Sequence, residues 1–186
     1  MLHIKNMVCE RCKTAVRHLL EEQGLHPEQI ELGEVTLQEK TLGKEATEKL
    51  KTGLQQLGFE LIDNRAGRLI EKIKNTIIRQ IHYSEVPPYK NFSHIISEAL
   101  HYDYPYLSKL FSETEGITIE QYIILQKIER VKELIAYDEL SLTQIADALH
   151  YSSVAHLSAQ FKKTTGMTPT QFKNLRERKR NTLDAV

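Results

Sequence analysis

The chain has 186 residues, of which 40% are hydrophobic and 27% are charged, and its 25 Lys and Arg balance 25 Asp and Glu. This composition, with eight glycines and five prolines, is typical of a globular protein and excludes a long disordered chain. No apolar run approaches the roughly 18 residues of a membrane span, and the N-terminus lacks the apolar core of a signal peptide. We therefore expect a cytoplasmic protein without membrane contact.

The first 64 residues predict six short elements. Apolar residues alternate in LHIKNM, which predicts a strand, and Lys13 to Gln23 has helical spacing. QIEL and VTL flank a Gly-containing turn and predict a hairpin. Ala46 to Leu57 predicts a second helix with Leu50, Leu54 and Leu57 facing inward, and ELI follows as the last strand. The predicted order is strand, helix, strand, strand, helix, strand.

Both cysteines lie in Cys9-x-x-Cys12, and in a reducing compartment this spacing indicates metal binding or redox chemistry more than a structural disulfide. With Met7 before the cysteines and Leu57-Gly58-Phe59 before the last strand, residues 1–64 resemble the heavy-metal-associated domains of copper and mercury carriers. The resemblance implies a ferredoxin-like βαββαβ fold, a buried Met7, and Cu(I) or another soft metal ion on Cys9 and Cys12. Thiolates select such ions, and a helix N-terminus lowers the pKa of a thiol.

Asn6 and Val8 depart from that family, which has Gly and Thr there, and the middle hairpin is shorter. A ferredoxin-like module that keeps its cysteines and serves as an interaction or effector domain is therefore the alternative. A thioredoxin-like redox motif fits less well, because no proline separates the cysteines.

Helical spacing resumes from Leu69 to Ile81. This segment predicts either a short coiled coil for dimerisation or a helix packed into the core of the next domain. We favour the core helix, because about two heptads are too few for a coiled coil. The following YSEVPPYKN, with Pro87-Pro88, predicts a loop.

A repeat then dominates the sequence. ISEALHY at 96–102 recurs as IADALHY at 145–151, an offset of 49, and a second set recurs at an offset of 50. That set is Leu107-Ser108, Phe111, Thr114, Gly116 and Thr118, matched by Leu157-Ser158, Phe161, Thr164, Gly166 and Thr168. A match that survives a one-residue insertion in a turn indicates a duplicated supersecondary unit.

Each copy predicts a helix that ends at ALHY, a tight turn, and a second helix with Leu and Phe buried four residues apart, which is the helix-turn-helix pattern. In the second copy Ser141 or Thr143 can cap the first helix. Ile119 to Tyr137 predicts one linking helix, roughly 25–30 Å long, which can hold two such units near one turn of B-DNA apart, about 34 Å. Its predicted buried residues are Tyr122, Leu125, Ile128, Val131 or Lys132, and Ile135.

Residues 65–180 are similar to the tandem helix-turn-helix domain of AraC/XylS-type transcription regulators. The resemblance rests on Ile145-Ala146, His150-Tyr151, Leu157, Phe161-Lys162, Gly166, Thr168-Pro169 and Phe172-Lys173, in this order. It implies an α+β chain with an all-α domain at 65–180 and a tail at 181–186. It also implies double-stranded DNA and RNA polymerase as partners of a monomer or homodimer. The chain departs from the family at His101 and His150, where the family has a turn glycine, and at Lys127 and Lys173, where it has arginine.

The resemblance also places the residues that would read DNA. They are Tyr104, Pro105, Tyr106, Ser108 and Lys109 in the first copy, and Ser153, Val154, Ala155, His156 and Ala159 in the second. Ser108, Lys109 and His156 can bond base edges, whereas Val154 and Ala155 offer only apolar contact, for example to a thymine methyl. Lys162 and Lys163 are expected on phosphates. The alternative for Tyr104 and Tyr106 is packing against the neighbouring helix.

Charge is distributed unevenly: residues 1–64 carry 8 Lys and Arg against 11 Asp and Glu, and residues 65–186 carry 17 against 14. Seven of these basic residues lie between Lys162 and Arg180, a cluster that can attract phosphates or form the solvated face of a C-terminal helix. The sequence therefore predicts a DNA-binding transcription regulator, modulated by a soft metal at Cys9 and Cys12. The alternative is a metal carrier or buffer with weak DNA binding. No catalytic constellation is recognisable, so no enzyme is expected.

Overall fold

The computed structural model describes residues 1–84 and 91–179, without the side chains of 176–179. The chain divides into two compact units, Met1–Ile78 with Phe92–Thr114 and Arg79–Asn91 with Glu115–Val186. The boundary predicted at residue 64 lies inside the first unit, whereas the loop at Pro87-Pro88 and the tail at 181–186 lie outside the described residues. Among the described residues, no helix is long and apolar enough to cross a membrane.

The first unit begins with a small antiparallel sheet and two helices. Their bounds are β1 Leu2–Lys5, α1 Glu10–Glu22, β2 Pro27–Glu31, β3 Glu34–Leu37, α2 Lys44–Gln56 and β4 Glu60–Leu61. This is the predicted order of elements, and the strands lie in the order β2-β3-β1-β4. Helix α1 starts three residues earlier than predicted, so Cys12 lies in its first turn.

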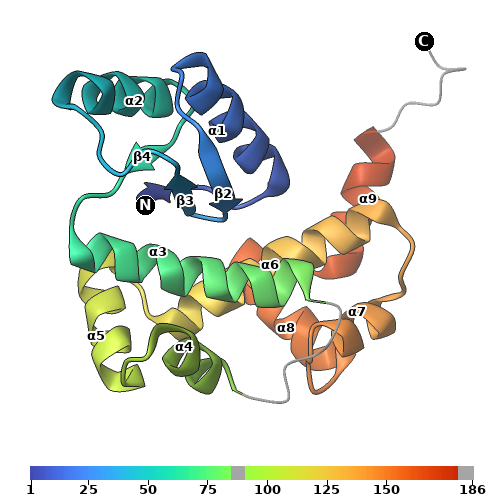
Figure 1. Ribbon diagram of the computed structural model, residues 1–186. Helices are drawn as coiled ribbons and strands as arrows, with labels where there is room; N and C mark the ends of the chain where they lie inside the picture. Colours follow the sequence, from blue (N-terminus) through green and yellow to red (C-terminus); the bar gives the residue numbers. More distant parts are fainter. Residues whose placement is uncertain (85–90, 180–186) are drawn as a thin grey trace, which may run out of the picture. The chain divides into compact units, whose positions relative to one another are not determined.

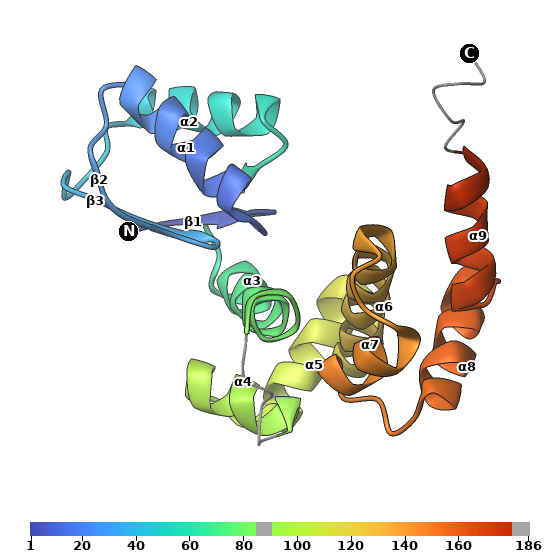
Figure 2. The same cartoon turned by 90° about the vertical axis from the view of Figure 1, so that its right-hand side faces the viewer.

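Helices α1 and α2 cover one face of the sheet (Figures 1 and 2). Ile4 and Val35 point into this core with Met7, and all three are fully buried, as expected for Met7. The prediction for Leu57 is wrong, because its side chain is 47% exposed. The residue follows the last helical turn of α2, where it no longer lies on the stripe formed by Leu50 and Leu54.

Helix α3 (Arg65–Ile78) covers the opposite, polar face of the sheet (Figure 2). Lys72 Nζ lies 2.8 Å from Glu34 Oε1, and the amide of Asn75 donates to the carbonyl of Leu32 at 3.0 Å. Gly33 is required here, because its φ is +79° and a Cβ would lie 2.3 Å from Asn75 Nδ2.

The apolar stripe predicted between residues 69 and 81 is buried within the chain. Its six members are at most 8% exposed: Leu69, Ile70, Ile73, Ile77, Ile78 and Ile81. The core helix is therefore confirmed over the coiled coil, although α3 ends at Ile78 and a π-helical turn η1 (Arg79–Tyr83) carries Ile81. Helix α4 (Phe92–Leu100), which packs on α3, and α5 (Tyr104–Glu115) complete the first unit.

The second unit is helical where it is described. It comprises η1, α6 (Ile119–Tyr137), α7 (Leu142–Ala148), α8 (Val154–Thr165) and α9 (Pro169–Lys179), and α6 contacts each of the others. Ile128, Val131 and Ile135 are buried as predicted, and Val131 rather than Lys132 faces inward. Leu125 is 43% exposed, against the prediction, and the buried residue near the start of α6 is Ile119, directly after the Thr118 cap.

Candidate nucleic-acid interface

The first helix-turn-helix motif consists of α4 and α5. Helix α4 ends in ALHY as predicted, and His101 follows it in the left-handed conformation with a φ of +56°. The amide of His101 donates to the carbonyl of Ser97 at 2.9 Å. Leu107 and Phe111 of α5 are fully buried, so the opposite side of this helix is left for a partner.

The second motif, α7 and α8, repeats this geometry. His150 has a φ of +55°, within a degree of its counterpart in the first motif, and Leu157 and Phe161 are again fully buried. The N-cap of α7 is Ser141 rather than Thr143, because Ser141 and Gln144 form a reciprocal capping box. The two copies of ALHY thus end two helices in the same backbone conformation, as a duplication requires.

The duplication includes the caps of the helices that follow the motifs, where Gln121 and Gln171 join the threonines already matched in the sequence. Thr118 and Gln121 cap α6 through two side-chain hydrogen bonds, and Thr168 and Gln171 begin α9 with the same pair of bonds. Thr118 and Thr168 are 50 residues apart, and so are Gln121 and Gln171. A glutamine three residues after a threonine could have revealed the matching caps in the sequence.

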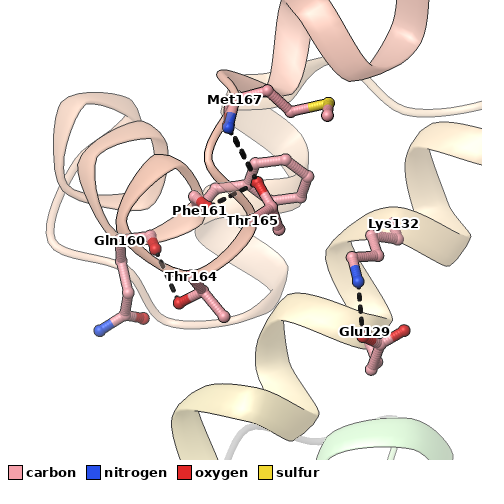
Figure 3. Close-up of polar contacts among 7 residues, drawn as sticks. All are labelled: Glu129, Lys132, Gln160, Phe161, Thr164, Thr165 and Met167. Carbon is pink, nitrogen blue, oxygen red and sulfur yellow. Dashed lines mark hydrogen bonds and ion pairs between the residues drawn. The ribbon is translucent and has the colours of Figure 1, made fainter. Parts of the chain in front are cut away.

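The end of α8 is fixed by its own threonines (Figure 3). Thr164 and Thr165 donate to the carbonyls of Gln160 and Phe161, and the amide of Met167 donates back to the Thr165 hydroxyl at 3.3 Å. Gly166 between them has a φ of +81°, as a left-handed helix cap requires. These bonds define the direction in which the chain enters α9.

Helix α5 presents most of the predicted reading residues to solvent. Pro105, Tyr106 and Lys109 are exposed, whereas Tyr104 and Ser108 are half-buried. Lys109 Nζ lies 3.8 Å from Glu113 on the same helix, so its charge is partly balanced. The ring of Tyr106 stacks on that of Tyr102, and 50% of Tyr106 is still exposed, so this residue packs within the motif and its reading role stays a prediction.

Helix α8 presents a smaller polar set. Ser153, Ala155, His156 and Ala159 are exposed with Lys162 and Lys163, and Val154 is half-buried. Ser153 is the N-cap and accepts a hydrogen bond from the amide of His156 at 3.1 Å. His156 Nδ1 lies 3.0 Å from the hydroxyl of Ser152, which leaves Nε2 of the ring for a base edge.

In each motif a cation from the preceding helix holds the tyrosine of ALHY. Arg65 of α3 donates to the hydroxyl of Tyr102, and its guanidinium carbon lies 5.7 Å from the centre of that ring. Lys127 of α6 lies 5.1 Å from the ring centre of Tyr151 and donates to the carbonyl of Leu149 at 2.8 Å. Burial lowers the pKa of Lys127 and raises the pKa of Tyr151 to about 12. The sequence did not reveal the Arg65 contact.

The family's two arginine positions therefore have structural contacts here. Lys127 fixes the end of α7, and Lys173 of α9 forms an ion pair with Asp138, the left-handed C-cap of α6. A lysine can make both contacts, because each needs one donor rather than the fork of a guanidinium.

The two cysteines lie at the start of α1. Their sulfurs are 3.1 Å apart, and both side chains are half-buried. Burial works to raise the pKa of the Cys9 thiol, but hydrogen bonds from Cys12 and from backbone amides outweigh it, and the pKa is lowered. Burial and the bond to Cys9 raise the pKa of Cys12. This donor set fits a soft ion that takes two thiolates, and the described residues contain no group of three or more His, Cys, Asp or Glu that could hold a metal ion.

Comparison with known proteins agrees with this geometry. Residues 96–175 match the family model described as a helix-turn-helix domain. The chain is 29% identical over 123 residues to the uncharacterized HTH-type transcriptional regulator YtdP of Bacillus subtilis (strain 168), covering 64% of this chain and 15% of that protein. It is 35% identical over 63 residues to the probable transcriptional regulator LumQ of Photobacterium leiognathi, covering 34% of this chain and 25% of that protein.

The chain therefore spans at most a quarter of the length of these two relatives. Among solved structures, the C-terminal domain of AraT, a response regulator from Geobacillus stearothermophilus, has a similar fold. It has a TM-score of 0.51 at 22% identity and covers 66% of this chain and 94% of that one. Residues 96–175 thus carry a helix-turn-helix domain.

Proposed function

We propose that this protein is a sequence-specific DNA-binding transcription regulator whose two helix-turn-helix motifs read adjacent major-groove segments. The observation that carries the proposal is the repeated geometry of the motifs, with His101 and His150 left-handed and Leu and Phe buried behind each exposed reading face. The family match over residues 96–175 supports it. Two reading helices on one chain make a monomer sufficient, and cytoplasmic location and contact with RNA polymerase belong to the same proposal.

Some of these side chains would contact bases, and others would contact phosphates. His156 can bond one base edge through Nε2, because Ser152 engages its other ring nitrogen, while Val154 and Ala155 can contact a thymine methyl. Lys162 and Lys163 are exposed near the end of α8 and provide phosphate contacts, which fix the register without reading sequence. In α5, Tyr106 and Lys109 carry the reading.

We infer further that Cys9 and Cys12 bind a soft metal ion and that this site modulates DNA affinity. The adjacent sulfurs, the lowered pKa of Cys9 and the buried Met7 support it, as does the strand order β2-β3-β1-β4, which is the order expected for a ferredoxin-like domain. A bound ion would supply a positive charge that both thiolates share. Metal carriage with weak DNA binding is the second candidate, favoured by the few base-reading side chains of α8.

The test is selection of DNA from a random-sequence pool by the purified chain at physiological salt, with and without Cu(I). The proposal predicts an enriched motif with two segments about one helical turn apart, and a change in affinity with Cu(I). A Cys9→Ser/Cys12→Ser variant should keep the motif and lose the response. Weak, salt-sensitive and unenriched binding would instead support the carrier, and an unchanged metal response of the double variant would exclude the cysteines as the sensor.

A further inference from the structure

Arg65 lies at the point where the sheet of the first unit is joined to its helix-turn-helix motif. The amide of Ile62 donates to the carbonyl of His3 at 2.8 Å, which extends the pairing of β4 with β1. Asn64 Oδ1 accepts from the amide of Gly67 at 2.6 Å, and a Cβ on Gly67 would lie 2.8 Å from Ile62. The residues before Arg65 are therefore packed and hydrogen-bonded.

Helix α3 is also held along its length. The ion pair of Lys72 with Glu34 and the buried hydrogen bond of Asn75 join it to the polar face of the sheet. A shift of the sheet therefore carries α3 with it, and Arg65 with α3.

Arg65 in turn contacts a stack of two tyrosines. Its guanidinium donates to the Tyr102 hydroxyl and lies over the ring, and the hydrogen bond raises the pKa of Arg65. The ring of Tyr102 stacks on Tyr106 with centroids 5.6 Å apart and planes 26° apart. Tyr106 belongs to α5 and is 50% exposed, so its orientation depends on the ring beneath it.

We propose that Arg65 and Tyr102 are positioning residues through which the N-terminal domain orients Tyr106 and so sets the base preference of the first DNA segment. This inference rests on the proposed DNA-binding function. The second motif lacks this dependence, because its tyrosine is held by Lys127 of α6, inside the second unit. The first segment is thus the one that the N-terminal domain controls.

The test repeats the DNA selection with Arg65→Ala, Arg65→Lys and Tyr102→Phe, each checked for an unchanged melting temperature. Arg68→Ala is the matched control, because it removes the same charge from the same helix. Arg65→Ala should reduce discrimination in the first segment about tenfold and leave the second segment unchanged. Arg65→Lys should keep part of this discrimination, and Tyr102→Phe should reduce it less than Arg65→Ala does. Arg68→Ala should leave the discrimination at the wild-type level.

Two results would overturn the inference while the proposed function stands. One is wild-type discrimination in Arg65→Ala, and the other is an equal loss at both segments, which would indicate a phosphate contact instead of orientation. If the wild-type chain enriches no motif, the proposed function itself fails and the inference fails with it. If a variant melts early, the base preference of the still-folded Tyr102→Phe chain decides the question.

Discussion

The two helix-turn-helix motifs have the same backbone and opposite charge. Residues 92–116 contain one lysine, Lys109, against four acidic residues, Glu98, Asp103, Glu113 and Glu115. Residues 141–166 contain Lys162 and Lys163 against Asp147. The buried residues and the turn have been kept after duplication, whereas the surfaces have diverged. On the proposed function, we expect the second motif to anchor the protein on phosphates. We expect the first motif to contribute aromatic contacts, because its acidic residues would repel phosphates.

The largest effect that tests this comparison is expected from Phe111→Ala and Phe161→Ala. Both side chains are fully buried at equivalent positions, so each truncation should cost about 3–5 kcal/mol of unfolding free energy. Hydrogen exchange should distinguish them, because Phe111 belongs to the unit that contains the sheet and Phe161 does not. Phe111→Ala should speed exchange in β1 and β3, and Phe161→Ala should leave these strands protected. Equal effects on the sheet would show one cooperative unit.

The charge difference predicts a second asymmetry, in DNA binding. Lys162→Ala/Lys163→Ala should weaken binding about tenfold for every sequence and lower the salt slope by roughly one to two, because phosphate contacts release counterions. Lys109→Ala should have a smaller effect, since Glu113 already balances this lysine. Titrations at several salt concentrations measure both quantities. A larger salt effect from Lys109 would reverse the assignment of the two motifs.

The shared turn predicts an effect that should be equal in both motifs. His101 and His150 have left-handed φ values of +56° and +55°, which residues with a Cβ adopt at a cost. His101→Gly and His150→Gly should each raise the unfolding free energy by about 0.5–1 kcal/mol, as read from urea melts. Destabilisation by one of them alone would show that its histidine makes a contact that stabilises the fold.

The smallest predicted effect concerns pH. Burial lowers the pKa of His3 in the first unit and of His82 in the second below the ordinary 6.5. Between the folded and unfolded pKa values of these histidines, the unfolded chain therefore binds more protons than the folded chain. Stability is therefore full above about pH 6.5 and is lost as the pH falls towards the folded pKa values. His3→Gln should flatten this loss for the first unit and His82→Gln for the second. Unchanged pH profiles in urea melts would contradict the assignment.

Periodicity and capping predicted most of the helices and strands, because both depend on residues close in sequence. The bounds of α6 and the cap at Ser141 are examples. The exposure of a residue at the edge of an apolar helix stripe, such as Leu125 of α6, was not predictable, because it depends on which other element packs against that edge.

The candidate site follows the same rule. Its predicted reading residues came from the resemblance to a known family, but the contact of Arg65 with Tyr102 joins residues 37 apart that no motif relates. Asn75 meets the hairpin at Gly33 in a similar way, through a fit of shapes that a sequence pattern does not record. Contacts between elements distant in sequence are thus what the structure adds.

The most direct test of two motifs reading two segments is hydroxyl-radical footprinting on the selected DNA. The wild-type chain should protect two segments centred about one helical turn apart. Tyr106→Ala should weaken protection of one segment, and His156→Ala should weaken the other. A single protected segment, or the loss of the same segment in both variants, would contradict the account.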